Sequence, residues 1–173
     1  MNKQTTRGFA VTGAILAGLA TLVGPAQATD QPAWQSERGN VIECHGRAHG
    51  ISIRASVYEN HRYGNTVQVV IGDPDAGNGA SRDSDDKFVV DGAVKASVKI
   101  GGKRVLIEGA AKRHGARTKV YDERDDAGFH IITRGFHRQL VTDMGARYAG
   151  KGIPLTCETA FHFDLEVKKI PLT

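Results

Sequence analysis

Strict alternation of apolar and polar residues constrains the fold of this chain more than any other feature. It runs through residues 51–58, 94–100 and 161–168, where apolar side chains occupy every second position. Successive side chains of a β-strand point to opposite faces, so the pattern predicts strands with one face on a core and the other in solvent. In the last segment the polar set, which includes His162 and Asp164, is predicted to face solvent. No segment has a convincing helical period, and we predict an all-β fold.

Glycine-containing turns separate the predicted strands. Asp91-Gly92 and Gly101-Gly102 lie between alternating segments, where a two-residue hairpin turn needs the positive φ that glycine adopts without strain. Hairpins of this kind form an antiparallel β-sandwich or a small closed β-barrel, because one-sided strands need a second packed face. We predict the sandwich, with the barrel as the alternative. The predicted strands, about nine or ten, cover roughly residues 40–46, 51–60, 65–72, 87–91, 93–100, 103–112, 116–123, 128–135, 138–148 and 153–169.

The first 28 residues have the features of a secretory signal peptide. Lys3 and Arg7 precede an apolar segment over residues 9–23, and a small-residue Ala-Gln-Ala site follows it. The apolar segment is shorter than the roughly 20 residues of a membrane-spanning helix, and no later segment is a candidate span. We predict that residues 1–28 are removed and that the protein is secreted and extracellular.

The remaining chain suits one domain of nearly balanced charge. We predict a flexible lead-in over residues 29–39 and a single all-β domain over residues 40–173. Removing Lys3 and Arg7 from the 23 basic residues leaves 21 against 19 acidic ones, a net charge of +2. Basic residues gather in residues 95–119, which we interpret first as a solvated strand face. The alternative is a surface that attracts an anionic envelope polymer by charge, and an extracellular protein is the other candidate partner. The same segment has no aromatic residue on which bases would stack, so nucleic acid is not a predicted partner.

The chain has two cysteines, Cys44 and Cys157. Two cysteines in an exported protein predict one disulfide bond between them. Neither belongs to a Cys-x-x-Cys pair, which disfavours a redox enzyme or a zinc ribbon. We therefore predict that the bond is architectural and closes most of the chain into one loop.

A polar stripe surrounds the first cysteine. In a strand over residues 41–50, four polar side chains point to the face opposite Cys44. His45 and His49 would lie roughly 13 Å apart in such a strand, too far to chelate one ion. We interpret the stripe first as a solvated strand face. Arg47 disfavours a cation, so an anionic ligand site is the first alternative, and a metal site that joins His45 to Glu43 or to a neighbouring strand is the second. The candidate ligand-binding residues are Glu43, His45, Arg47 and His49.

One long connection interrupts the hairpins. Residues 73–86 are rich in Asp and Gly and poor in apolar residues, so we predict a surface loop. Its spacing departs from the EF-hand pattern, but its oxygen ligands suit a looser calcium site. The alternative is a solvated loop. The candidate calcium ligands are Asp73, Asp75, Asn78, Asp83 and Asp85.

Several segments resemble small secreted actinobacterial β-rich proteins of unassigned function. The resemblance rests on residues 57–60, 63–70 and 154–157 and on Asp73-Pro74. It spans most of the chain after the signal peptide and implies an exported β-rich fold. It assigns no catalytic or binding residue.

The motifs favour binding over catalysis. No Gly-x-Ser-x-Gly nucleophile elbow is present, and both cysteines are assigned to the disulfide. We predict a secreted, non-catalytic β-domain with a binding or cell-envelope-associated role and no cofactor apart from the calcium hypothesis. One alternative is a hydrolase or metal-assisted enzyme, in which His45 or His49 meets Asp164 or Glu166 near the disulfide. Another is a protease-inhibitor-like module that presents residues 73–86.

Overall fold

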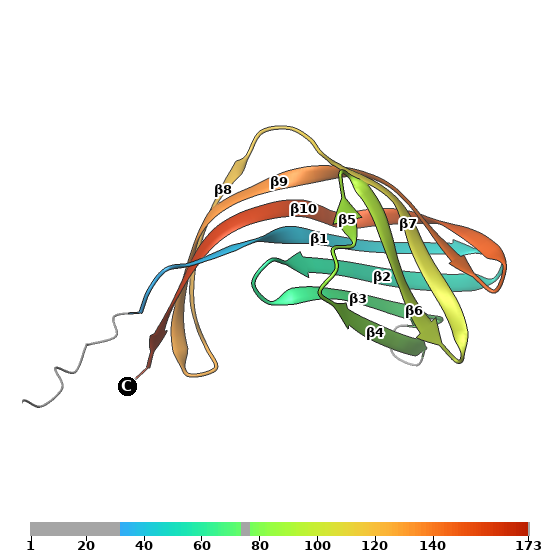
Figure 1. The fold of residues 1–173 in the computed structure, drawn as a ribbon, viewed down its shortest axis with the longest axis horizontal. Helices are drawn as coiled ribbons and strands as arrows, with labels where there is room; N and C mark the ends of the chain where they lie inside the picture. Colours follow the sequence, from blue (N-terminus) through green and yellow to red (C-terminus); the bar gives the residue numbers. More distant parts are fainter. Residues whose placement is uncertain (1–31, 74–76, 173) are drawn as a thin grey trace, which may run out of the picture. The chain divides into compact units, whose positions relative to one another are not determined.

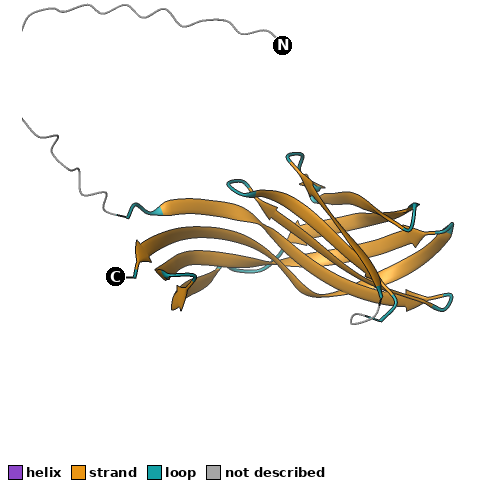
Figure 2. Cartoon of the chain, turned by 90° about the horizontal axis from the view of Figure 1, so that it is seen from below, coloured by secondary structure: helices purple, strands orange, loops and turns teal. Residues whose placement is uncertain are grey.

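The computed structural model describes residues 32–73 and 77–172. The predicted signal peptide and the first part of the predicted lead-in lie outside these residues. The described residues form strands and loops (Figure 2), and no helix among them is long and apolar enough to cross a membrane. The strands are β1 (Gln35–Ala48), β2 (Ile51–Asn60), β3 (Gly64–Ile71), β4 (Asn78–Ser84), β5 (Val89–Val90), β6 (Ala93–Ile100), β7 (Lys103–Arg113), β8 (Thr118–Asp126), β9 (Phe129–Tyr148) and β10 (Lys151–Pro171).

These strands form one antiparallel sheet that folds over on itself. The strand order is β4-β3-β2-β1-β10-β9-β7-β6-β5, and β8 pairs with the first half of β9. The end strands β4 and β5 do not pair with each other, so the sheet is not closed. Instead β6 packs against β3 and β4, and in Figure 1 it crosses them. The all-β antiparallel prediction is confirmed, and the closed-barrel alternative is wrong.

The apolar core lies between the two layers made by this fold. One layer contributes Ile53, Val57 and Val69 from β2 and β3, and the other contributes Val94 and Ile107 from β6 and β7. All five side chains are at most 2% exposed. Burying a side chain of this size contributes roughly 1.5–3 kcal/mol. The alternating pattern of the sequence therefore identifies the core positions of these strands.

Both predicted two-residue turns are confirmed. Asp91 and Gly92 have φ values of 51° and 80°, and Gly101 and Gly102 have 56° and 78°. Positive φ at both central positions is the type I′ geometry, whose twist matches that of the flanking strands.

The predicted disulfide is also confirmed. Cys44 of β1 and Cys157 of β10 are register partners, with their Cα atoms 3.9 Å apart and their sulfurs bonded. The bond joins the two central strands of the sheet. Its position beside the core agrees with the 5% exposure of Cys44.

A β-bulge next to the disulfide changes the facing of β10. Glu43 pairs with Thr159 and Cys44 with Cys157, so Glu158 is an extra residue in β10. Inward positions are odd-numbered before the bulge, as at Leu155, and even-numbered after it, as at Ala160; both side chains are buried. The second half of β10 therefore presents the opposite set of side chains to the interior.

Three strand assignments differ from the sequence predictions. Strand β9 is continuous over Phe129–Tyr148, where we predicted separate strands over residues 128–135 and 138–148. Strand β1 begins at Gln35, inside the predicted flexible lead-in, because residues 35–39 pair with β10. Residues 78–84 form β4, although we predicted a loop over residues 73–86. None of the β4 side chains is fully buried, and its attachment to β3 is a main-chain ladder. A strand held in this way does not need alternating apolar residues, so the sequence pattern does not reveal it.

Candidate functional site

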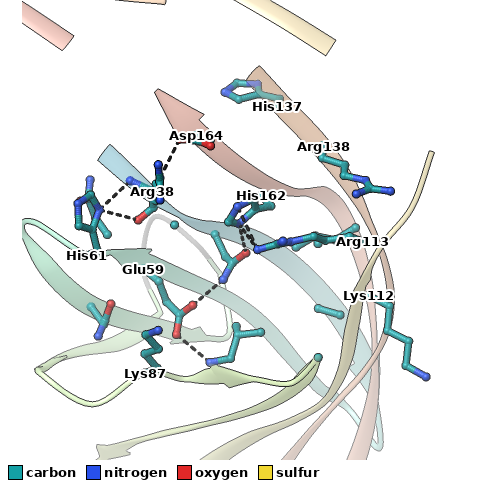
Figure 3. Close-up of a pocket in the computed structure, with 18 of the residues that line it drawn as sticks. Arg38, Glu59, His61, Lys87, Lys112, Arg113, His137, Arg138, His162 and Asp164 are labelled. Atoms are coloured by element: carbon teal, nitrogen blue, oxygen red, sulfur yellow. Dashed lines mark hydrogen bonds and ion pairs between the residues drawn. The ribbon is translucent and has the colours of Figure 1, made fainter. Parts of the chain in front are cut away.

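A cavity of about 1280 Å³ opens at one end of the space between the layers. It begins where the apolar core ends. On β1 the inward position after Ile42 is Asn40, and the next is Arg38; on β2 Glu59 follows Val57. The strands are continuous here, but their inward side chains change from apolar to polar. Figure 3 shows these side chains converging from several strands.

Strand β10 contributes His162 and Asp164 because of the bulge at Glu158. The extra residue places these side chains on the inward face, beyond the buried Ala160. Phe163 consequently lies on the outer face, where its ring stacks with Tyr58 at a centroid distance of 6.2 Å. The prediction that this polar set faces solvent outside the core is therefore wrong for His162 and Asp164, which line the cavity, whereas Glu166 of the same set is exposed.

A buried carboxylate anchors one side of the cavity. Glu59 Oε1 accepts hydrogen bonds from the main-chain N–H groups of Phe88 at 2.5 Å and Val89 at 2.8 Å. Its Oε2 accepts from Asn40 Nδ2 at 2.6 Å. The residue is only 5% exposed, and these three donors replace the water that the carboxylate loses on burial.

The same carboxylate sets the direction of a hydrogen-bond chain. Because Asn40 gives its N–H to Glu59, its Oδ1 faces His162 Nδ1 at 3.1 Å, and this nitrogen must carry the proton. Arg113 Nη2 lies 3.1 Å from Nε2, the acceptor nitrogen of this tautomer, and 3.4 Å from Nδ1. The imidazole is neutral in this arrangement. Burial and the adjacent Arg113 guanidinium lower the pKa of His162, which favours the neutral ring.

A second carboxylate in the cavity is held by two arginines. Asp164 Oδ1 accepts from Arg38 Nε at 2.9 Å, and Oδ2 accepts from Arg117 Nη2 at 3.4 Å. Glu59 and Asp164 are thus engaged by donors of the protein itself.

Cations outnumber carboxylates around the cavity. Seven lysines and arginines line it against four aspartates and glutamates. Within residues 32–73 and 77–172, only two of the seven cations pair with a carboxylate, and both use Asp164. Figure 3 shows two of these cations extending into the cavity: Arg113 from the end of β7, and Lys87 from the loop between β4 and β5. The cations without a carboxylate partner are Arg62, Lys87, Lys112, Arg113 and Arg138.

Three histidines line the cavity at separate places. His61 Nδ1 accepts from the main-chain N–H of Arg38 at 2.8 Å. His137 stacks on Phe161 at a centroid distance of 4.3 Å, and burial lowers its pKa. In the part of the chain that the structure describes, no three His, Cys, Asp or Glu side chains are grouped to hold a metal ion.

The predicted ligand stripe lies elsewhere. Glu43, His45 and Arg47 are exposed on the face of β1 opposite Cys44, as predicted, but none lines the cavity. His49 is not on the strand, because it forms the β1–β2 turn with a φ of 54°.

The predicted cluster of these histidines with the late carboxylates does not form. The β1–β10 register places His45 opposite Thr156 and Arg38 opposite Asp164. Seven strand positions separate His45 from Asp164 along the sheet, or about 23 Å. The carboxylate near His45 is instead Glu158 of the bulge, with Nδ1 and Oε1 3.7 Å apart.

Two of the five candidate calcium ligands lie on β4. Asn78 and Asp83 lie at opposite ends of this strand, five positions or about 17 Å apart, so they cannot share one ion. Asp83 accepts a hydrogen bond from the Thr66 hydroxyl at 2.7 Å. Asp75 lies outside the described residues, and Asp73 and Asp85 flank the strand. The single site that the loop prediction assumed is therefore wrong, because the segment is extended.

Sequence reasoning overlooked the cavity residues. Glu59 continues the odd-numbered series of Ile53, Ala55 and Val57 on β2, and a charged residue at an inward position is a signal that was present. Asn40 and Arg38 continue the even-numbered inward series of β1 in the same way. The contribution of β10 left no such signal, because a bulge is not visible in an alternating pattern.

Comparisons with known proteins assign no family. The sequence matches no family model and no curated protein. A solved structure described as a "putative AttH" from Nitrosomonas europaea is similar at 10% sequence identity and a TM-score of 0.35. The alignment covers 91% of this chain and 59% of that one, so this chain spans less than two thirds of its length. At this TM-score the likeness carries no conclusion about function.

Proposed function

We propose that this protein is a secreted, non-catalytic domain that binds an anionic ligand in the cavity between its layers. The observation that carries the proposal is the set of five lysines and arginines without a carboxylate partner among the described residues. Like charges that line a partly enclosed space, with Lys87 and Arg113 directed into it, repel one another, and a bound anion relieves this repulsion. Carboxylate and phosphate groups are the chemistry that arginine recognises best.

The carboxylates of the cavity compete little for these cations. Glu59 is saturated by two main-chain amides and Asn40, and Asp164 is held by Arg38 and Arg117. The two remaining lining carboxylates, Asp85 and Asp91, leave an excess of positive charge.

Engagement of the polar groups also favours binding over proton transfer. Both ring nitrogens of His162 are used within the protein, and so are both carboxylate oxygens of Glu59. A general acid or base needs a free position toward its substrate. The disulfide and the signal-peptide pattern support export, and an anionic cell-envelope polymer is a suitable source of the ligand.

Calorimetric titration of the chain without residues 1–28 with glucuronate, citrate and inorganic phosphate tests the proposal. Arg113→Gln and Lys87→Gln should each weaken binding by about tenfold, because each removes a charge-assisted contact. Added salt should weaken binding further.

Lys99→Gln is the matched control. It removes the same charge from the exposed outer face of β6, away from the cavity, and should leave the affinity unchanged. Equal weakening by all three substitutions would show that the anion binds to diffuse surface charge. The absence of binding by every anion would refute the proposal.

A further inference from the structure

The strands that line the cavity continue beyond it as a single-layered lip. Strands β8, β9, β10 and β1 lie side by side there (Figure 1). Their register puts Phe136 of β9, Asp164 of β10 and Arg38 of β1 in one row, and Arg134 and Glu166 in the next. Successive rows lie about 7 Å further from the cavity. We define the lip by Trp34, Arg117, Arg134, Phe136, Asp164 and Glu166.

Each carboxylate of the lip is paired with arginine, whereas the cavity keeps cations without a carboxylate. Arg134 pairs with Glu166 at 2.8 Å, and Asp164 is shared by Arg117 at 3.4 Å and Arg38 at 2.9 Å. Within the described residues, by contrast, Lys87 and Arg113 in the cavity have no carboxylate partner. A ligand that spans both regions therefore meets unpaired cations at one end and arginines already paired with carboxylates along the rest.

The lip also carries exposed aromatic rings. Phe136, which also lines the cavity, is 40% exposed, and Trp34 is 37% exposed. The Arg117 guanidinium lies 5.1 Å from the Phe136 ring centroid, and that of Arg134 lies 3.9 Å from the Trp34 ring. Each ring thus adjoins an arginine–carboxylate pair that offers both donors and acceptors. Apolar ring surface beside such groups suits a partner with an apolar face and many hydroxyls.

From this division of charge we infer that the ligand is an oligosaccharide with an acidic terminal residue. The acidic residue occupies the cavity, and the adjoining neutral sugar rings lie against Phe136 and Trp34. The inference rests on the proposed function, since it names the class of anion that the cavity binds.

A uniformly charged polymer fits the lip poorly. A nucleic acid strand carries a phosphate at every unit and depends on free cations along its path. Here Asp164 and Glu166 already occupy the lip arginines and would repel the phosphates. The acyl chain of a lipid also fits the lip poorly, because it would lie against the arginine–carboxylate ion pairs of the lip.

The test compares glucuronate with a trisaccharide of one terminal glucuronate and two neutral glucose units. Binding is followed by calorimetry and by fluorescence of Trp34, the only tryptophan in the chain. The trisaccharide should bind about tenfold more tightly than glucuronate. Trp34→Ala, followed by calorimetry, should abolish that gain and leave the glucuronate affinity unchanged, because Trp34 lies outside the cavity lining, whereas Arg113→Gln should weaken both. Phe129→Ala is the matched control, since this ring is similarly exposed at 38% and lies outside both the lip and the cavity lining.

The outcomes separate this inference from the proposed function. Equal affinity for glucuronate and the trisaccharide, or equal weakening of both by Trp34→Ala, overturns the inference and leaves anion binding intact. Tighter binding of a single-stranded oligodeoxynucleotide than of the trisaccharide also overturns it. Failure of every anionic probe, glucuronate included, overturns the proposed function and the inference with it.

Discussion

Replacing Glu59 by glutamine tests the hydrogen-bond chain beside the cavity. The new amide oxygen can still accept from the main-chain N–H groups of Phe88 and Val89, which share one oxygen of Glu59. The new amide nitrogen, however, faces the Nδ2 donor of Asn40. Two donors cannot bond each other, so Asn40 must rotate its amide.

Rotation of the Asn40 amide also changes the hydrogen bonds of His162 and Arg113. Asn40 then presents N–H to His162 Nδ1, so the proton of the imidazole must move to Nε2. Nε2–H in turn faces the Arg113 guanidinium, and the bond between His162 and Arg113 is lost. We therefore expect Glu59→Gln to change the tautomer of a histidine that it does not touch.

The expected loss of stability follows from the bonds involved. Three hydrogen bonds to a charged acceptor become neutral ones, and one more is broken, while the smaller desolvation cost of an amide offsets part of this. Glu59→Gln should therefore lower the free energy of unfolding by about 1–3 kcal/mol. Glu59→Ala leaves three donors without an acceptor and should cost about 3–5 kcal/mol.

Urea unfolding measures the stabilities, and nitrogen-15 chemical shifts of the imidazole measure the tautomer. Asp91→Asn is the matched control, because it removes one carboxylate from the same cavity without touching the chain. Asparagine also tolerates the φ of 51° at this position. The reasoning is refuted if His162 in the Glu59→Gln variant keeps its proton on Nδ1.

Three further predictions concern the scaffold. Replacing both Cys44 and Cys157 by alanine should lower the free energy of unfolding by up to about 5 kcal/mol, because the bond joins residues 113 positions apart; a urea midpoint unchanged from wild type would contradict this. Stability should fall as the pH drops below about 6.5 toward the lowered pKa of His162, because the unfolded chain takes up a proton that the folded chain does not. Urea unfolding between about pH 7.5 and pH 5 should show this fall, and a slope that stays unchanged in His162→Gln would exclude His162 as its source. Gly39→Ala should cost about 2–3 kcal/mol, since its Cβ would lie 1.7 Å from the Glu59 main-chain oxygen. Thermal unfolding of Gly152→Ala, whose Cβ meets open space, should match that of wild type.

The alternating pattern identifies the strands because burial on one face is a local property. In β6 the alternating apolar residues from Val94 to Ile100 are buried, and so are those from Ile53 to Val57 in β2. The turn at Gly101 and Gly102 can also be predicted locally, because the positive φ of each residue depends on the residue type at that position. Strand β4 was not predicted, because an edge strand held by main-chain hydrogen bonds does not need apolar side chains at alternating positions.

The folding-over of the sheet is not local, and neither is the cavity. Whether antiparallel hairpins close into a barrel depends on whether the end strands pair, and nothing in β4 or β5 encodes that. The convergence of Lys87 and Arg113 depends on how the two layers meet. A small net charge over the whole chain hides this convergence, because most of the acidic residues lie elsewhere.

The apolar core and the cavity are lined by the same inward faces of the strands. A side chain at an inward position loses contact with water. Next to the apolar Ile42 and Val57, the inward positions hold the polar side chains of Asn40 and Glu59. Each such polar group costs free energy unless it is bonded, so the residues nearest the core are the ones with complete hydrogen bonding. Exposed cations such as Arg113 need no carboxylate, because water reaches their side chains. The completeness of hydrogen bonding thus follows the burial of each polar group, and the unpaired positive charge is left where a ligand can reach it.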